Sequence, residues 1–214
     1  MDLIRHIRIW AVASLLAIPV PVCADSYEDI MQAIKLDDGD TVARLIQRGV
    51  DVDTASRDGE SLLMYSAKEG TLNTIRTLLA AKAKVNARNA HGETALMLAA
   101  LEGRTDAVEL LLDHGAEVNH AGWTPLMYAA VKNRVATARL LIARGADINA
   151  TAENGTTPLM MAAREGSLPM VLLLVDHGAD INHRTPHGYT ALRVAKDRGK
   201  QDIAEALVRA GAEN

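Results

Sequence analysis

The chain has 214 residues, a formal net charge of −4, one cysteine and no phenylalanine. A mildly acidic chain without a basic stripe is a poor candidate for binding nucleic acid or an anionic membrane surface. Any core must be built from Leu, Ala, Val, Ile and Met, a set of side chains that favours many small layers over one large core.

The first 24 residues have the layout of a secretory signal peptide. MDLIRHIR carries two arginines, the following 14 residues are apolar and uncharged, and Val22 and Ala24 place small residues at the recognition positions for cleavage. We therefore expect cleavage after Ala24 and a periplasmic or secreted protein, which no longer associates with a membrane. Two alternatives remain open: lipid attachment at Cys23, and an uncleaved membrane anchor.

From residue 25 onward the sequence repeats itself. A glycine opens each of five copies at intervals of 33, 30, 33 and 33 residues: Gly59, Gly92, Gly122, Gly155 and Gly188. The opening segments are similar, as in GETALMLAA, GWTPLMYAA and GTTPLMMAA, and so are the closing segments, as in DHGAEVN and DHGADIN. Repeats of this length are typical of solenoids, in which each small unit buries its apolar face against its neighbours.

Each copy predicts a pair of short helices. Thr124–Pro125 and Thr157–Pro158 place a hydroxyl at a helix N-cap and a proline at the first helical position, where its missing N–H is not needed. The other copies have a hydroxyl residue at the same place: Ser61, Thr94 and Thr190. The first helices are expected to end at a glycine, or at Asn133 in the fourth copy, and apolar runs such as VLLLV predict the second helices.

The pattern G-x-T-P-L-x-x-A-A-x-x-G, followed by L-L-x-x-G-A-D-V-N, resembles the ankyrin repeat. The resemblance implies an all-α solenoid of about six repeats, made of short helix pairs joined by β-hairpin loops and curved around a concave groove. We divide the chain into a signal peptide, 1–24, and a repeat domain, 25–214, with repeats at 25–57, 58–90, 91–120, 121–153, 154–186 and 187–214. The first and last repeats are expected to serve as caps.

Two features depart from the ankyrin pattern. The histidine that usually follows T-P-L is replaced by Met64, Met97, Met127 and Met160 and then by Arg193. We interpret the methionines as apolar filling between repeats, with scavenging of oxidants as the alternative. Lys82 stands where the other copies close with glycine, so we expect either a strained left-handed turn or a different helix end at this position.

Residues 25–214 contain no motif that predicts catalysis, a cofactor or a metal centre. Of the six histidines only His183 and His187 are four residues apart, and the intervening RTP predicts a loop and not a helix; the segments G-x-S-x-G and H-E-x-x-H are absent. We interpret the histidines as residues of helix ends or of the surface. The carboxylates are scattered through the repeats, so we expect no enzymatic activity.

The resemblance places partner binding on the first helix of each copy and on the hairpin rim. The expected groove is apolar at its centre and charged at both ends, and its contact residues are Tyr65, Leu98, Leu101, Tyr128, Val131 and Lys132. His91 and Tyr189 flank opening glycines and belong to the expected rim. The alternative is that the aromatic and aliphatic members of this set mainly pack on one another.

The junction between the third and fourth copies is three residues shorter than the others. It must shorten one hairpin and leave a notch in the rim, and Trp123 stands directly after Gly122 at the edge of that notch. A tryptophan in a central recess is typical of a binding anchor. The alternative is that the indole ring fills the space that the missing residues leave.

These features together predict an exported, monomeric, non-catalytic module that binds another protein. Two binding roles stay open: supporting a periplasmic enzyme by docking to it, or acting as an immunity protein that covers the active site of a toxin or effector enzyme. Self-association through the solenoid is a purely structural alternative.

Overall fold

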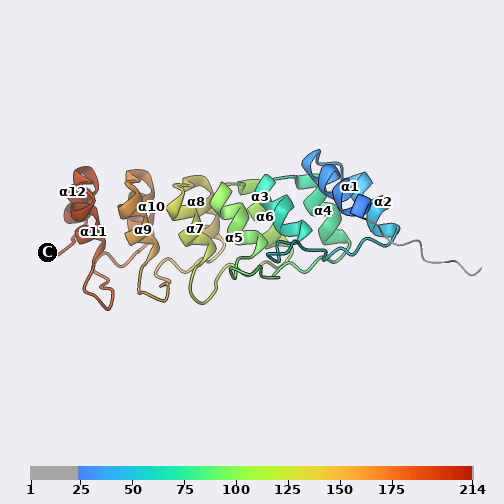
Figure 1. The fold of residues 1–214 in the computed structure, drawn as a ribbon. Coiled ribbons are helices and arrows are strands. Elements are labelled where there is room, and N and C mark those ends of the chain that lie inside the picture. Colours follow the sequence, from blue (N-terminus) through green and yellow to red (C-terminus); the bar gives the residue numbers. More distant parts are fainter. Residues whose placement is uncertain (1–23, 214) are drawn as a thin grey trace, which may run out of the picture.

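The computed structural model describes residues 24–213, which form six consecutive helix pairs stacked in a row (Figure 1). The predicted signal peptide lies outside the described residues except for Ala24, at which α1 begins. In the described part, no helix is long and apolar enough to cross a membrane. The pairs are α1 (Ala24–Lys35) with α2 (Gly39–Gln47), α3 (Leu62–Glu69) with α4 (Leu72–Ala80), α5 (Ala95–Glu102) with α6 (Thr105–Asp113), α7 (Pro125–Val131) with α8 (Val135–Ala143), α9 (Pro158–Glu165) with α10 (Leu168–Asp176), and α11 (Ala191–Asp197) with α12 (Gln201–Arg209).

The fold is the all-α solenoid that the repeats predict, and each predicted repeat holds one helix pair. We call the first helix of each pair the inner helix and the second the outer helix. From α3 onward, neighbouring inner helices contact one another more extensively than neighbouring outer helices do, whereas at the N-terminal end the contact of α2 with α4 is more extensive than that of α1 with α3. The loops between pairs project along one side of the row, next to the inner helices (Figure 1).

Side-chain caps start the inner helices as predicted. In α3, α5, α7, α9 and α11, the hydroxyl of the N-cap residue accepts a hydrogen bond from the backbone N–H three residues later. Pro125 and Pro158 occupy the first turns of α7 and α9. These bonds satisfy backbone donors that a helix start otherwise leaves without partners, so each helix begins at a residue that the sequence specifies.

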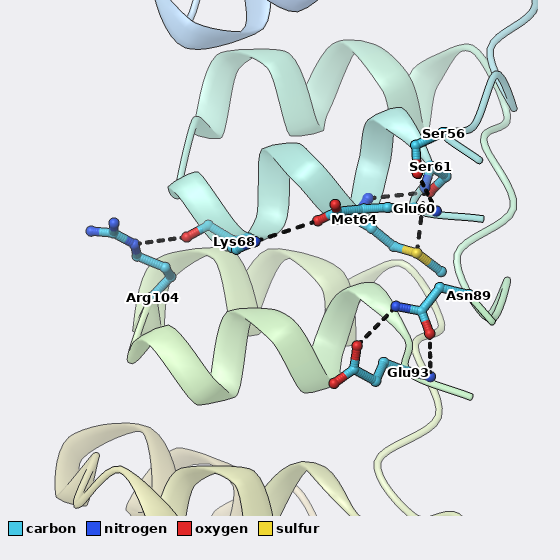
Figure 2. A network of polar contacts seen from close by, with 8 residues as sticks. All are labelled: Ser56, Glu60, Ser61, Met64, Lys68, Asn89, Glu93 and Arg104. Carbon is cyan, nitrogen blue, oxygen red and sulfur yellow. Dashed lines mark hydrogen bonds and ion pairs between the residues drawn. The ribbon is translucent and has the colours of Figure 1, made fainter. Parts of the chain in front are cut away.

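The methionines that replace the usual histidine are buried between the repeats. Met64, Met97, Met127 and Met160 are each at most 3% exposed. Their thioethers therefore fill the seam between adjacent inner helices, which favours the packing interpretation over the scavenging of oxidants. In α3, the sulfur of Met64 also accepts a hydrogen bond from the N–H of Ser61 at 3.4 Å (Figure 2).

Asparagines provide the polar connection between successive repeats. The side chain of Asn119 donates to the carbonyl of Gly145 at 2.9 Å and accepts from the N–H of Asp147 at 2.8 Å. Three other asparagines make the same pair of bonds to the next repeat: Asn86, Asn149 and Asn182. The sequence separation to the glycine carbonyl is 26 residues for Asn119 and 29 for the others, so the closing turns stay in register across the short junction.

The turn that ends each inner helix has a left-handed residue, and two of these residues are not glycine. Asp37 has a φ of 52° and Asn133 a φ of 53°. The Asp37 carboxylate accepts the N–H of Thr74 at 2.9 Å, and Asn133 shares a hydrogen bond with the hydroxyl of Ser167. Both partners belong to the next repeat, so each side chain gains a bond that offsets the cost of its backbone conformation.

Of the two alternatives that the sequence left open at Lys82, the structure has the left-handed turn, with a φ of 68°. At the equivalent position, the other repeats have glycines with φ between 87° and 103°: Gly49, Gly115, Gly145, Gly178 and Gly211. The Lys82 side chain is exposed and forms no hydrogen bond or ion pair with the described residues. Nothing therefore compensates for its backbone strain.

We expect Lys82→Gly to raise the free energy of unfolding by about 0.5–1 kcal/mol, because glycine adopts this φ without a steric cost. Urea unfolding curves of the two proteins measure the difference. Asn133→Gly is the matched control, and it should gain less or lose stability because it also removes the bond to Ser167. An unchanged or lower midpoint for Lys82→Gly would contradict the expectation.

Candidate functional site

The loops at four junctions between repeats share one hairpin turn. In the first, the N–H of Ser56 donates to the carbonyl of Glu60 at 2.9 Å, and the N–H of Gly59 donates to the carbonyl of Ser56 at 3.0 Å. The same two bonds recur in the turns that begin at Asn89, Ala152 and Thr185. Among the described residues, the short junction at 119–123 has neither bond, so the three missing residues remove the turn itself.

The lost turn leaves space beside the neighbouring hairpins. A Cβ atom added to Gly59 would lie 3.2 Å from the Cα of Asn89, and one added to Gly155 would lie 2.6 Å from the Cδ of Pro186. At Gly92 and Gly122, an added Cβ would meet nothing within 4 Å. Full-length hairpins therefore stack on the next hairpin, and we call the open space beside Gly92 and Gly122 the notch.

A pocket of about 530 Å³ occupies the notch. Its size falls in the range of about 300–1,000 Å³ that is usual for binding pockets. Apolar and aromatic side chains form much of its wall: Met97, Leu101, Trp123, Tyr128 and Val131. The polar side chains that line it are Arg88, His91 and Glu153.

Two aromatic rings meet at the edge of this pocket. Trp123 remains 43% exposed, and its ring centroid lies 5.4 Å from that of Tyr128 in an edge-on arrangement. The Tyr128 hydroxyl donates to Oε1 of Glu93 at 3.0 Å. Burial, together with the charge of Glu93, raises the pKa of Tyr128, so the phenol stays protonated and holds its ring in place.

The structure brings together five of the predicted site residues and separates the other four. The pocket is lined by His91, Leu101, Trp123, Tyr128 and Val131. Leu98 is only 5% exposed, which corrects the expectation that it contributes groove surface: its side chain faces the core between inner helices. Outside the pocket lie Tyr65, half-buried against the core, and the exposed residues Lys132 and Tyr189.

His120 lies beside the site, in contact with the pocket residue Arg88, and the sequence interpretation missed it. Its side chain is 3% exposed, and its Nδ1 lies 2.6 Å from Nη2 of Arg88 and 3.6 Å from Oε2 of Glu117. Because the guanidinium can only donate, Nδ1 accepts, and the buried Nε2 has no partner among the described residues. His120 is therefore neither at a helix end nor on the surface, which corrects the sequence interpretation for this residue. His114 and His177 are C-cap residues, as that interpretation expects.

The surroundings of His120 keep its ring neutral. Burial lowers the pKa of His120 below its ordinary value of 6.5, and the charge of Arg88 lowers it further, against the smaller opposite effect of Glu117. One sequence cue pointed to this residue: His120 lies within the short junction, near Trp123 in the chain.

The groups that line the pocket are of the kinds that bind a ligand by stacking, apolar contact and charge. It combines two rings, an aliphatic wall and charged groups of both signs, in a depression that is open to solvent. Within residues 24–213, no group of three or more His, Cys, Asp or Glu side chains is placed to hold a metal ion.

A family model described as "Ankyrin repeats (3 copies)" matches residues 30–121, 89–152 and 145–214 of this chain. The three matches overlap and together extend from residue 30 to residue 214. A comparison with curated proteins gives no significant match.

We expect the free energy of unfolding to fall as the pH drops below 6.5, because His120 binds a proton more readily in the unfolded chain than in the folded one. Its contribution to stability is present above its unfolded pKa and is lost as the pH falls toward its folded pKa. In His120→Gln, which cannot titrate but can still accept from Arg88, the loss should be smaller. Urea unfolding of both proteins between about pH 7.5 and 5 measures the two losses. If the free energy of unfolding falls equally with pH in both proteins, a group other than His120 is responsible.

Proposed function

Because the chain belongs to the ankyrin-repeat family, we propose that it is a non-catalytic module that binds another protein through the notch and the adjoining inner helices. The observation that carries this proposal is the position of Trp123. Its ring is 43% exposed at the edge of a pocket in the middle of the solenoid. Tryptophans in central recesses contribute much of the affinity in protein interfaces.

The geometry of the notch supports this role in a second way. The Trp123 ring contacts Tyr128, which Glu93 holds by a hydrogen bond, so the exposed anchor is positioned before a partner arrives. A binding group that is already ordered loses little conformational entropy on association. The same surface would serve an enzyme that the module supports or a toxin that it neutralises.

We place this function in the periplasm or outside the cell, on the basis of the N-terminal segment. The support is the order of charged residues, apolar run and small residues that ends at Ala24. The partner is accordingly another exported protein, and the module acts as a monomer.

The exported protein should begin at Asp25. N-terminal sequencing of the protein recovered from a periplasmic extract is expected to read Asp25-Ser26-Tyr27. A lipid-modified Cys23, or an intact Met1 in the membrane fraction, would contradict cleavage after Ala24.

Trp123→Ala should weaken the binding of a partner captured from a periplasmic extract. We expect a loss of about 2 kcal/mol or more, which is roughly a thirty-fold rise in Kd. The free energy of unfolding should fall by only about 1 kcal/mol or less, because the ring is partly exposed and makes one ring contact. Titration calorimetry and urea unfolding measure the two quantities.

Tyr189→Ala is the matched control for this experiment. Tyr189 follows its opening glycine as Trp123 does, and it is 42% exposed, but it lies outside the pocket. Its loss should leave partner binding nearly unchanged. If the two substitutions weaken binding equally, the interface is not centred on the notch. If Trp123→Ala lowers the free energy of unfolding by roughly 3 kcal/mol or more, the indole ring fills space in the fold and is not a binding anchor.

A further inference from the structure

Two equivalent glutamates in neighbouring hairpins have different partners. Glu60 and Glu93 each follow an opening glycine, and Oε1 of Glu60 lies 3.8 Å from Nζ of Lys68. The residue equivalent to Lys68 in the next repeat is Leu101, so Glu93 has no such lysine. Its oxygens accept from the amide of Asn89 at 2.8 Å and from the hydroxyl of Tyr128 at 3.0 Å, which are neutral donors. Figure 2 shows the ion pair of Glu60 and the contact of Glu93 with Asn89.

Two equivalent aromatic rings differ in the same way. Tyr189 and Trp123 each follow an opening glycine, and the guanidinium carbon of Arg193 lies 5.3 Å from the centroid of the Tyr189 ring. The residue equivalent to Arg193 in the fourth repeat is Met127, which is fully buried. Among the described residues, no cation is stacked on the exposed ring of Trp123.

Two carboxylates and one guanidinium lie in or beside the notch. Glu153 lines the pocket, and Glu93 adjoins it through the hydroxyl of Tyr128. Arg88 also lines the pocket, but its Nη2 points to His120, whose Nδ1 lies 3.6 Å from the carboxylate of Glu117. Nη2 of Arg88 therefore points to the His120 ring at the rim, and no ion pair joins a cation to Glu93 or Glu153 among the described residues.

We propose that an arginine side chain of the partner protein occupies the notch. Its guanidinium stacks on Trp123 and donates to the carboxylates of Glu93 and Glu153, and its methylene groups pack on Leu101 and Val131. A guanidinium suits this place because it is attracted to the face of an indole ring and donates several hydrogen bonds in one plane. At the equivalent positions of other repeats, the Glu60 carboxylate is paired with Lys68 and the Tyr189 ring is stacked with Arg193.

The inference deepens the proposed function by naming the group that the partner presents, and it can be tested without the partner. The probe is N-acetyl-arginine amide, titrated into the full chain. The readout is the indole N–H signal of Trp123 in NMR spectra, assigned by its loss in Trp123→Phe because the chain also contains Trp10. N-acetyl-citrulline amide, an uncharged analogue, and N-acetyl-glutamate amide, an acidic one, are the comparison probes.

We expect a saturable shift of the Trp123 signal with the arginine probe and a Kd on the order of millimolar, as suits a ligand of this size. The citrulline probe should bind roughly five-fold more weakly or less well still, because it has no charge to pair with the carboxylates. Equal binding of arginine and citrulline, preferred binding of the acidic probe, or no shift with any probe up to about 50 mM would overturn the proposal.

Three variants locate the binding. The double variant Glu93→Gln/Glu153→Gln should weaken the arginine probe by roughly five-fold or more, while Glu60→Gln, whose carboxylate already has Lys68, should not change it. Leu101→Lys should abolish binding, because the new ammonium group would occupy the place of the ligand as Lys68 does beside Glu60. Thermal melts confirm that each variant is folded, and an unchanged Kd in the double variant would overturn the proposal.

The outcomes separate this inference from the proposed function. If a captured partner depends on Trp123 but the arginine probe does not bind, the interaction module stands and the cation preference is wrong. If the probe binds and no partner protein depends on Trp123, the chemistry of the pocket stands and the proposed function is wrong.

Discussion

The pairing of each closing asparagine with the backbone of the next repeat is the constraint on which this structure depends. An asparagine amide has one donor face and one acceptor face, so it can satisfy a carbonyl and an N–H of the same turn only at one relative position of the two repeats. The buried seam of Leu, Ala and Met is much less directional, because the hydrophobic effect depends on the apolar area buried and not on the angle between groups. The asparagines therefore fix the register, and the apolar seam provides the bulk of the stabilisation.

This division explains why a deletion in one loop creates a site without disturbing the solenoid. The asparagine pair is preserved at Asn119, although its sequence separation is three residues shorter than at the other repeats. The helices on both sides are held in place, so the shortening is confined to the hairpin, which loses its turn. The hairpins stack on one another elsewhere, and the gap that opens exposes Trp123, Tyr128 and the wall behind them.

Substitutions at equivalent positions show how a repeat acquires a specific surface. Where the chain places Asp37 or Asn133 in a left-handed turn, the side chain takes a partner in the next repeat. Where a lysine or arginine lies beside a hairpin glutamate or ring, it pairs with that group inside the repeat, as Lys68 does with Glu60 and Arg193 with Tyr189. In the notch, Leu101 and Met127 stand at those positions, so the polar and aromatic groups of the rim are left open to a ligand.

The sequence alone determined the elements and their order, because caps, left-handed turns and the apolar period are local properties of the chain. Thr124 caps α7 and Pro125 begins it with bonds inside one repeat, and Lys82 adopts a positive φ because the turn around it is complete in its own repeat. The length of the short junction also located the notch and Trp123. Only the tertiary structure decided which neighbours turn inward: Leu98 is buried between inner helices, His120 is enclosed beside Arg88, and Glu93 bonds with Tyr128 from the next repeat. These contacts join residues about 30 positions apart, and the packing of whole repeats fixes their distance and burial.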